Sequence, residues 1–220
     1  MPHPSSPSVD TLPRPGDRHA ASSPGRVLTV VGVSGSPTTP SKTSVLVGEV
    51  AGAFAAGLGG RASLLELAPL LPELAAGPSR TDLGKNARLA LEEVEAADLI
   101  VVGSPAYRAT YTGLFKLFFD HIGQYALVDK PVVLTATGGS DRHALLVEHQ
   151  MRPLFGFFQA LTLPLGIFAQ SSDLEGYRLS SADLRHRIDV SVRRTLPLIS
   201  SQLGGDTGGR SRDFARPDAF

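Results

Sequence analysis

The alternation of short apolar runs with longer amphipathic segments is the feature that most limits what this chain can fold into. Residues 26–33 (RVLTVVGV), 98–104 (DLIVVGS) and 131–137 (PVVLTAT) are short, rich in valine and leucine, and followed by loop residues. Such continuous apolar runs are typical of strands that are buried on both faces. Residues 61–67 and 164–170 are two further strand candidates. Because helical segments separate the runs, the sequence predicts a parallel sheet covered on both faces by helices.

Parallel strands joined in this way favour the flavodoxin-like order 2-1-3-4-5, a five-stranded sheet in a three-layer α/β sandwich. In that order the first and third strands are neighbours at the point where the strand order reverses. Ligands of such sheets bind at the carboxyl ends of the strands at this point. The loops that follow strands 1 and 3 are therefore the places where the sequence predicts a binding site.

The helical segments have recognisable starts and stops. Ser41 can cap a helix that Gly59 ends, because serine is favoured at N-caps and glycine at C-caps. Two later helices are expected to kink or break, at Pro153 and near Pro197, because proline lacks the backbone N–H. The segment 112–122 has apolar residues on more than one face, so we expect it to be deeply buried or to face another subunit.

A chain of 220 residues suits a single domain, which we place at residues 26–203. Residues 1–25 are rich in proline, serine and charged groups and contain no apolar stretch. We therefore expect a disordered N-terminal arm there and not a secretory signal. Residues 204–220 have a similar composition and are expected to form a flexible C-terminal tail.

The composition excludes several classes of function. The formal net charge is zero, which gives no general attraction to nucleic acid or to an anionic membrane. The chain has no cysteine, so disulfides, thiolate catalysis and cysteine metal sites are excluded. Its apolar stretches are shorter than the roughly 20 residues that a membrane-spanning helix needs. The sequence therefore predicts a cytoplasmic protein that binds neither nucleic acid nor membrane.

The loop after the first strand, SGSPTTPSKTS at residues 34–44, is rich in hydroxyl groups and leads into a helix N-terminus. Unpaired N–H groups and the helix dipole favour an anion there, and a lysine adds positive charge. The loop lacks the G-x-x-x-x-G-K-[ST] pattern of a triphosphate site, which leaves a monoester phosphate as the ligand. Plain capping and turn chemistry is the alternative. The candidate ligands are Ser34, Ser36, Ser41, Lys42 and Thr43.

The loops after the third and fourth strands offer a flat surface and a close backbone approach. Residues 103–113 (GSPAYRATYTG) place tyrosines and an arginine beside a proline turn, against which a planar ring could lie. Residues 137–143 (TGGSDRH) contain two glycines that let the backbone approach a ligand closely. Turn formation and packing are the alternatives for these residues. Together with the phosphate loop they suit FMN, which has a phosphate at one end and a flat ring at the other.

These three segments resemble the NAD(P)H-dependent FMN reductase family, and most of all the reductases that serve alkanesulfonate and methanesulfonate monooxygenases. The resemblance covers residues 26–200. It implies that hydroxyls, backbone amides and one lysine hold the FMN phosphate, and that two later loops surround the isoalloxazine ring. The phosphate residues would be Ser36, Ser41, Lys42 and Thr43; the ring would be lined by Pro105, Ala106, Tyr107 and Arg108 and flanked by Thr137, Gly138, Gly139 and Ser140.

Two positions depart from the family pattern, and two others raise open questions. Thr38 stands where many relatives carry an arginine, and Lys42 replaces a frequent arginine, so the phosphate site should be less cationic and FMN binding weaker.

In the sulfonate branch an aromatic insertion near Tyr111 is associated with a π-helical turn at a subunit interface; a packing tyrosine is the alternative. His143 is either a proton-transfer group or a helix-start or interface histidine.

The resemblance implies an oxidoreductase in which NADH or NADPH gives a hydride to flavin N5. The flavin carries this chemistry, so no catalytic side chain is predicted. No metal is predicted either, because His121 and His149 lack a paired ligand spacing. Reduced FMN would pass to a partner FMN-dependent monooxygenase in sulfonate or organosulfur use, and the chain would form a homodimer or homotetramer. A quinone, azo or metal-ion reductase that retains FMN, a flavodoxin-like electron carrier and a non-catalytic interaction module remain alternatives.

Overall fold

The computed structural model describes residues 26–204, so the predicted arm at 1–25 and nearly all of the predicted tail at 204–220 lie outside the described residues. The main sheet is parallel and has the order β2-β1-β3-β4-β5, with β6 also paired to β4. This is the flavodoxin-like order that the sequence predicted. The strands of this sheet are β1 (Thr29–Ser34), β2 (Arg61–Glu66), β3 (Leu99–Pro105), β4 (Pro131–Gly138), β5 (Leu161–Thr162) and β6 (Ile167–Gln170).

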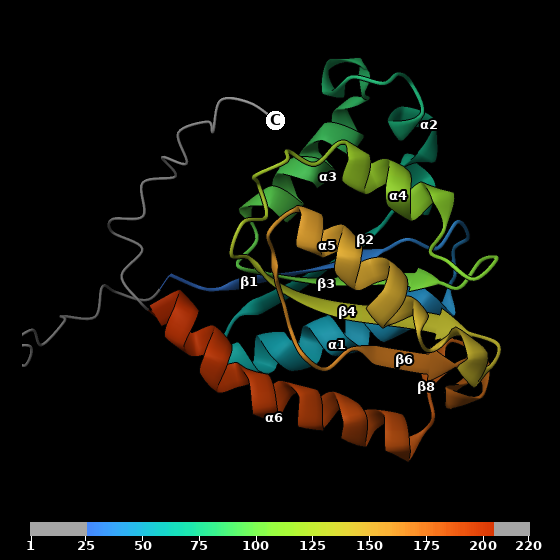
Figure 1. The fold of residues 1–220 in the computed structure, drawn as a ribbon, viewed down its shortest axis with the longest axis vertical. Coiled ribbons are helices and arrows are strands. Elements are labelled where there is room, and N and C mark those ends of the chain that lie inside the picture. Colours follow the sequence, from blue (N-terminus) through green and yellow to red (C-terminus); the bar gives the residue numbers. More distant parts are fainter. Residues whose placement is uncertain (1–25, 205–220) are drawn as a thin grey trace, which may run out of the picture.

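Helices cover both faces of the sheet (Figure 1). One face packs against α1 and α6, and the other packs against α3, α4 and α5. Within residues 26–204, no helix combines the length and the apolar character that a membrane span requires. The helices are α1 (Lys42–Leu58), α2 (Leu71–Leu74), α3 (Lys85–Ala96), α4 (Gly113–Asp120), α5 (Arg152–Phe157) and α6 (Ala182–Gly204).

The fifth strand differs from its prediction, because it is split in two. The segment expected at 164–170 is strand only from Ile167 onward, and a separate short strand, β5, precedes it. Pro164 lies between the two pieces and has no N–H to give to the ladder. The N–H of Leu163 still donates to the carbonyl oxygen of Val132 at 2.8 Å, so both pieces stay beside β4.

Helix α1 begins and ends where the sequence predicted. Its N-cap is Ser41, whose hydroxyl oxygen accepts the N–H groups of Thr43 and Ser44 at 3.1 and 3.4 Å. Its C-cap is Gly59, with φ of 63°, a left-handed conformation that glycine adopts without a steric cost. Residues at the two ends of this helix are therefore fixed by local chemistry.

The two prolines act differently from each other. A π-helical stretch, Val147–Met151, runs directly into α5, whose second residue is Pro153, so the helix changes type next to this proline and does not end there. The expected interruption near Pro197 is wrong, since α6 runs through it to Gly204. An internal proline costs a helix about 3 kcal/mol, and Ile199, which lies beyond it, is completely buried in the core. Burial of the last turns against α1 and the core offsets the lost hydrogen bond.

The junction between the π-helical stretch and α5 is fixed by Arg152. Its guanidinium donates two hydrogen bonds to the carboxylate of Glu148, at 2.6 and 2.8 Å, and one to the carbonyl oxygen of Leu163 at 3.1 Å. The hydrogen bonds from Arg152 hold the pKa of Glu148 below its ordinary value. One side chain thus ties the helix to the segment between the two halves of the split strand.

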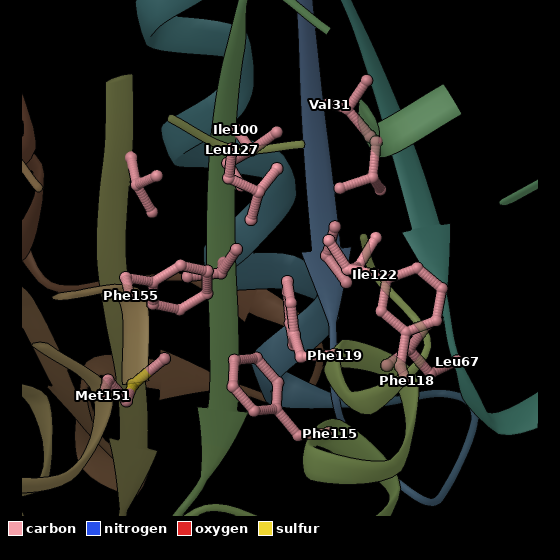
Figure 2. Packing of buried hydrophobic residues seen from close by; sticks show 14 of the residues in the cluster. Val31, Leu67, Ile100, Phe115, Phe118, Phe119, Ile122, Leu127, Met151 and Phe155 are labelled. Atoms are coloured by element: carbon pink, nitrogen blue, oxygen red, sulfur yellow. The ribbon is translucent and has the colours of Figure 1, made fainter. Parts of the chain in front are cut away.

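A cluster of phenylalanines fills the core beneath α4 and α5 (Figure 2). The ring of Phe119 lies 4.8 Å from that of Phe115, 5.3 Å from that of Phe118 and 4.9 Å from that of Phe155, measured between centroids. All four side chains are buried within this one chain. Of the two explanations for the apolar segment 112–122, the structure supports deep burial.

Candidate functional site

A pocket of about 430 Å³ opens at the carboxyl end of the sheet, between the loops that follow β1, β3, β4 and β6. Its volume lies in the range of roughly 300–1,000 Å³ that small-molecule sites occupy. Three of these loops are the ones that the sequence singled out. The pocket is lined by Ser36, Thr38, Pro40, Ser41, Lys42, Thr43, Pro105, Tyr107, Thr137, Gly176 and Tyr177.

The loop after β1 is held against the sheet by backbone contacts at Gly35. Its N–H donates to the carbonyl oxygen of Gly103 at 2.7 Å, and its own carbonyl oxygen accepts the hydroxyl of Thr112 at 2.6 Å. A Cβ at Gly35 would lie 2.6 Å from Cδ2 of Phe115, so only glycine fits this close approach. The loop is therefore positioned by the same α4 residues that build the aromatic core.

Ser41 is the residue of this loop best suited to an anion. Its oxygen accepts two N–H groups of α1, but its O–H stays available as a donor, because a hydroxyl both accepts and donates. The first turn of α1 contains no acidic residue, so the positive end of the helix dipole is not cancelled. Ser36 differs, because its hydroxyl already donates to the carbonyl oxygen of Thr38 at 3.0 Å. At Ser41, capping of α1 therefore leaves a hydroxyl donor available to a ligand.

Ser34 does not line the pocket. It is the last residue of β1 and is buried, and its hydroxyl lies 2.9 Å from that of Ser44. Ser44 in turn donates to the carboxylate of Glu66 at 2.6 Å. This chain of polar groups joins β1, α1 and β2, so Ser34 has a structural partner inside the fold.

Lys42 and Thr43 link the first loop to two others. Lys42 lines the pocket, and its ammonium donates to the carbonyl oxygen of Ser171 at 2.7 Å, which leaves further N–H donors on that group. The hydroxyl of Thr43 lies 2.7 Å from that of Thr137, at the end of β4. Thr43 and Thr137 are both buried, so the two loops are joined at the floor of the pocket.

The loop after β3 forms a tight turn with Tyr107 at its base. Tyr107 and Thr110 exchange two backbone hydrogen bonds, of 2.8 and 3.1 Å, around Arg108 and Ala109. Both central residues have positive φ, 51° and 69°, as in a type I′ turn. Such a conformation is strained for residues with a side chain, and it points to a site where the backbone position matters. Tyr107 lines the pocket and is half exposed, whereas Ala106 and Arg108 do not line it.

The end of β4 contributes Thr137 to the pocket, but the predicted ligands Gly138, Gly139 and Ser140 do not line it. Gly138 is enclosed, because a Cβ there would lie 2.9 Å from the ring of Phe168 and 3.1 Å from Cβ of His143. A Cβ at Gly139 would meet no atom within 4 Å. Packing therefore favours glycine at position 138 but not at position 139.

His143 lies at the end of this loop. Its Nδ1 is buried and has no hydrogen-bond partner among the described residues. A buried polar atom without a partner is unusual in a folded protein and calls for an explanation such as a ligand.

Tyr111 precedes a helix and is not part of one. Helix α4 starts at Gly113, and its N-cap is Thr112, whose hydroxyl accepts the N–H of Phe115 at 3.1 Å. The tyrosine ring lies 5.4 Å from that of Phe115 and packs against the core. The π-helical stretch of this chain lies elsewhere, at Val147–Met151.

Four pocket residues were not among the predicted ligands: Thr38 and Pro40, which lie in the first loop, and Gly176 and Tyr177, which lie outside the three predicted loops. Gly176 and Tyr177 form the two-residue turn of a small antiparallel hairpin, β7 (Leu174–Glu175) and β8 (Arg178–Leu179). In the segment LEGYRL, a pair that begins with glycine separates two short segments that each contain a leucine. This pattern is a hairpin signal that could have been recognised. Its position beside the first loop could not, since the two are far apart in sequence. Within the described part of the chain, no three His, Asp or Glu side chains gather closely enough to hold a metal ion.

The comparisons with known proteins agree on one family. Residues 28–175 match the family described as NADPH-dependent FMN reductase. The chain is 46% identical to the NADH-dependent FMN reductase SfnE of Pseudomonas putida, over 79% of this chain and 94% of the relative. It is 42% identical to an FMN reductase (NADPH) of Pseudomonas aeruginosa, over 83% of this chain and 94% of the relative.

A solved structure extends the agreement to three dimensions. An oxidoreductase of Corynebacterium diphtheriae superposes with a TM-score of 0.71 at 30% sequence identity, over 80% of this chain and 99% of the other. These similarities confirm the resemblance drawn from the sequence, together with the predicted enzyme class and its FMN and nicotinamide cofactors. The chain belongs to the NADPH-dependent FMN reductase family of oxidoreductases.

Proposed function

We propose that this protein reduces FMN with a nicotinamide donor and supplies the reduced FMN to a separate FMN-dependent monooxygenase of sulfonate or organosulfur metabolism. The observation that supports the reductase activity is the pocket at the N-terminus of α1, which Ser41 and Lys42 line and where a helix dipole favours an anion. The partner class comes from the branch of the family that the sequence resembles. NADH and NADPH both remain candidate donors.

The residues of the pocket fit FMN at both ends. Ser41 and the first turn of α1 would hold the phosphate, with Lys42 as the cation beside it. Pro105 and Tyr107 would lie against the flavin, and Thr137 would close the floor through its contact with Thr43. Bound FMN supplies a ring that accepts a hydride, so the protein's task is binding and alignment.

The composition of the phosphate site supports release of the flavin. Among the residues that line the pocket, Lys42 is the single cation, and its ammonium also donates to Ser171. A bidentate arginine would hold a phosphate more firmly than a lysine shared with a backbone carbonyl group. A flavin held in this way is suited to an enzyme that treats FMN as a substrate to be handed on.

The first test is steady-state oxidation of NADH or NADPH by the purified protein with added FMN. We expect turnover that depends on free FMN, loss of flavin during gel filtration, and sulfite release when a sulfonate monooxygenase is added. An electron carrier or an interaction module would show no turnover. A quinone or azo reductase would retain its flavin and prefer those acceptors. Retained flavin without sulfite release would contradict the two-component function.

The assembly and location of the protein are part of the same proposal. We propose a homodimer or homotetramer, supported by large apolar side chains that this single chain leaves exposed, such as Leu145 at 61% and Phe157 at 62% exposure. Light scattering during the same gel filtration gives the mass, and a monomer at micromolar concentration would contradict this. We also propose a cytoplasmic location, which the lack of cysteine supports; export of the native protein to the periplasm would contradict it.

The phosphate site can be tested by comparing FMN with riboflavin, which lacks the phosphate. Replacing Ser41 and Lys42 together by alanine removes a hydroxyl donor and the nearby cation. A hydrogen bond to a charged group contributes about 1.5–3 kcal/mol, so we expect the Kd for FMN to rise at least tenfold and that for riboflavin to stay unchanged. Flavin fluorescence titration measures both values. An unchanged Kd for FMN would show that the phosphate lies elsewhere.

A further inference from the structure

The β7–β8 hairpin forms a fourth side of the pocket, in addition to the three loops that the sequence predicted. Its two strands are anchored by Leu174 and Leu179, which are 3% and 5% exposed and belong to the core beneath α1 and α6. Gly176, with φ of 58°, occupies the first central position of the turn, where a two-residue hairpin needs a positive φ. The geometry of the turn therefore places Tyr177 at its tip, over the pocket.

The base of the hairpin is fixed by Asp173. Its carbonyl oxygen accepts the N–H groups of Ser180 and Ser181 at 3.0 and 3.1 Å, and its carboxylate accepts that of Gln170 at 2.8 Å. The Lys42–Ser171 hydrogen bond then joins this base to the phosphate loop. The hairpin is thus held in place from both sides, and its tip is not a loose surface loop.

Tyr177 presents a large ring that the protein itself does not cover. It is 54% exposed although it lines the pocket, and Tyr107 across the same pocket is 50% exposed. Among the described residues, no aromatic ring packs against either of them, whereas Tyr111 packs on Phe115. Exposed aromatic surface on two sides of one pocket is what an apolar, planar or chain-like part of a ligand can cover.

We propose that Tyr177 is a flavin-positioning residue, whose ring forms the outer wall of the site and slows the departure of the bound flavin. This inference rests on the proposed function, since it takes FMN as the ligand of the pocket. Tyr177 lines the same pocket as Ser41 and Lys42, so its ring would cover the ribityl chain that leads from the phosphate to the flavin ring. The contact is made by the ring surface of Tyr177 and not by its hydroxyl group.

Replacing Tyr177 should affect FMN and riboflavin alike, whereas replacing a phosphate ligand should affect FMN alone. Riboflavin has the same ribityl chain as FMN but no phosphate, so Tyr177→Ala should weaken both ligands by the same factor. Loss of one aromatic contact corresponds to a rise in Kd of about five- to tenfold. We expect this rise in the dissociation rate, and an equal rise in the KM for FMN while kcat is unchanged. Tyr177→Phe keeps the ring and should restore the unmodified values.

The experiment measures flavin fluorescence on the full-length protein, by titration and by stopped-flow dilution, with FMN and riboflavin as probes. Tyr125→Ala is the matched control, because Tyr125 is 45% exposed but does not line the pocket. Thermal unfolding confirms that each variant is folded. Unchanged flavin affinity in Tyr177→Ala, or equal weakening in Tyr177→Phe, would overturn the proposal. If the unmodified protein fails to bind FMN, the proposed function fails instead, so the two failures are distinguishable.

Discussion

Replacing Phe119 by alanine is expected to lower the free energy of unfolding by about 3–5 kcal/mol, the range found for large aromatic truncations in cores. Phe119 is 1% exposed and its ring contacts those of Phe115, Phe118 and Phe155. The truncation removes apolar burial and leaves a cavity that rigid neighbouring rings cannot fill. Urea unfolding followed by circular dichroism measures the change in midpoint and slope.

Tyr125→Ala is the matched control for this prediction. It also removes an aromatic ring, but from a side chain that is 45% exposed. Surface substitutions usually change stability by less than about 0.5 kcal/mol, so the two variants should differ by several kilocalories per mole. A loss at Phe119 no greater than that at Tyr125 would contradict the packing described for the aromatic cluster.

Replacing Gly35 by alanine is expected to destabilise the fold by about 1–3 kcal/mol, as overpacking of a filled interior does, and to weaken FMN binding. The added Cβ would lie 2.7 Å from Cβ of Phe115, an atom fixed to the α4 backbone, so the loop has to move. Movement would strain the hydrogen bonds from Gly35 to Gly103 and from Thr112 to Gly35, which position the phosphate loop. Chemical denaturation and FMN titration test both effects on one variant.

Gly52→Ala is a control that should change stability in the opposite direction. Gly52 lies inside α1, is exposed, and would meet no atom within 4 Å with an added Cβ. Alanine is favoured over glycine in a helix by roughly 0.5–1 kcal/mol, so this variant should be more stable and bind FMN normally. If Gly35→Ala proved as harmless as Gly52→Ala, the close approach between the first loop and α4 would be disproved.

The sequence alone determined the order of the sheet and the end at which the site lies. Short apolar runs separated by helices can bury both faces only in a parallel sheet, and parallel strands bring their carboxyl ends to one edge. Ser41 and Gly59 marked the ends of α1 because caps depend on local conformation. These features follow from residues close together in the chain, so a pattern of a few residues is enough to predict them.

Only the tertiary structure decided which candidates share the pocket. Ser34 and Ser36 lie two residues apart, yet the first is paired inside the fold and the second lines the pocket, because the chain leaves the sheet between them. Pro197 stays within a helix because burial of Ile199 outweighs its lost hydrogen bond. The hairpin that carries Tyr177 reaches the phosphate loop through a contact between residues 129 positions apart. Such outcomes depend on packing between distant segments, which local sequence patterns do not contain.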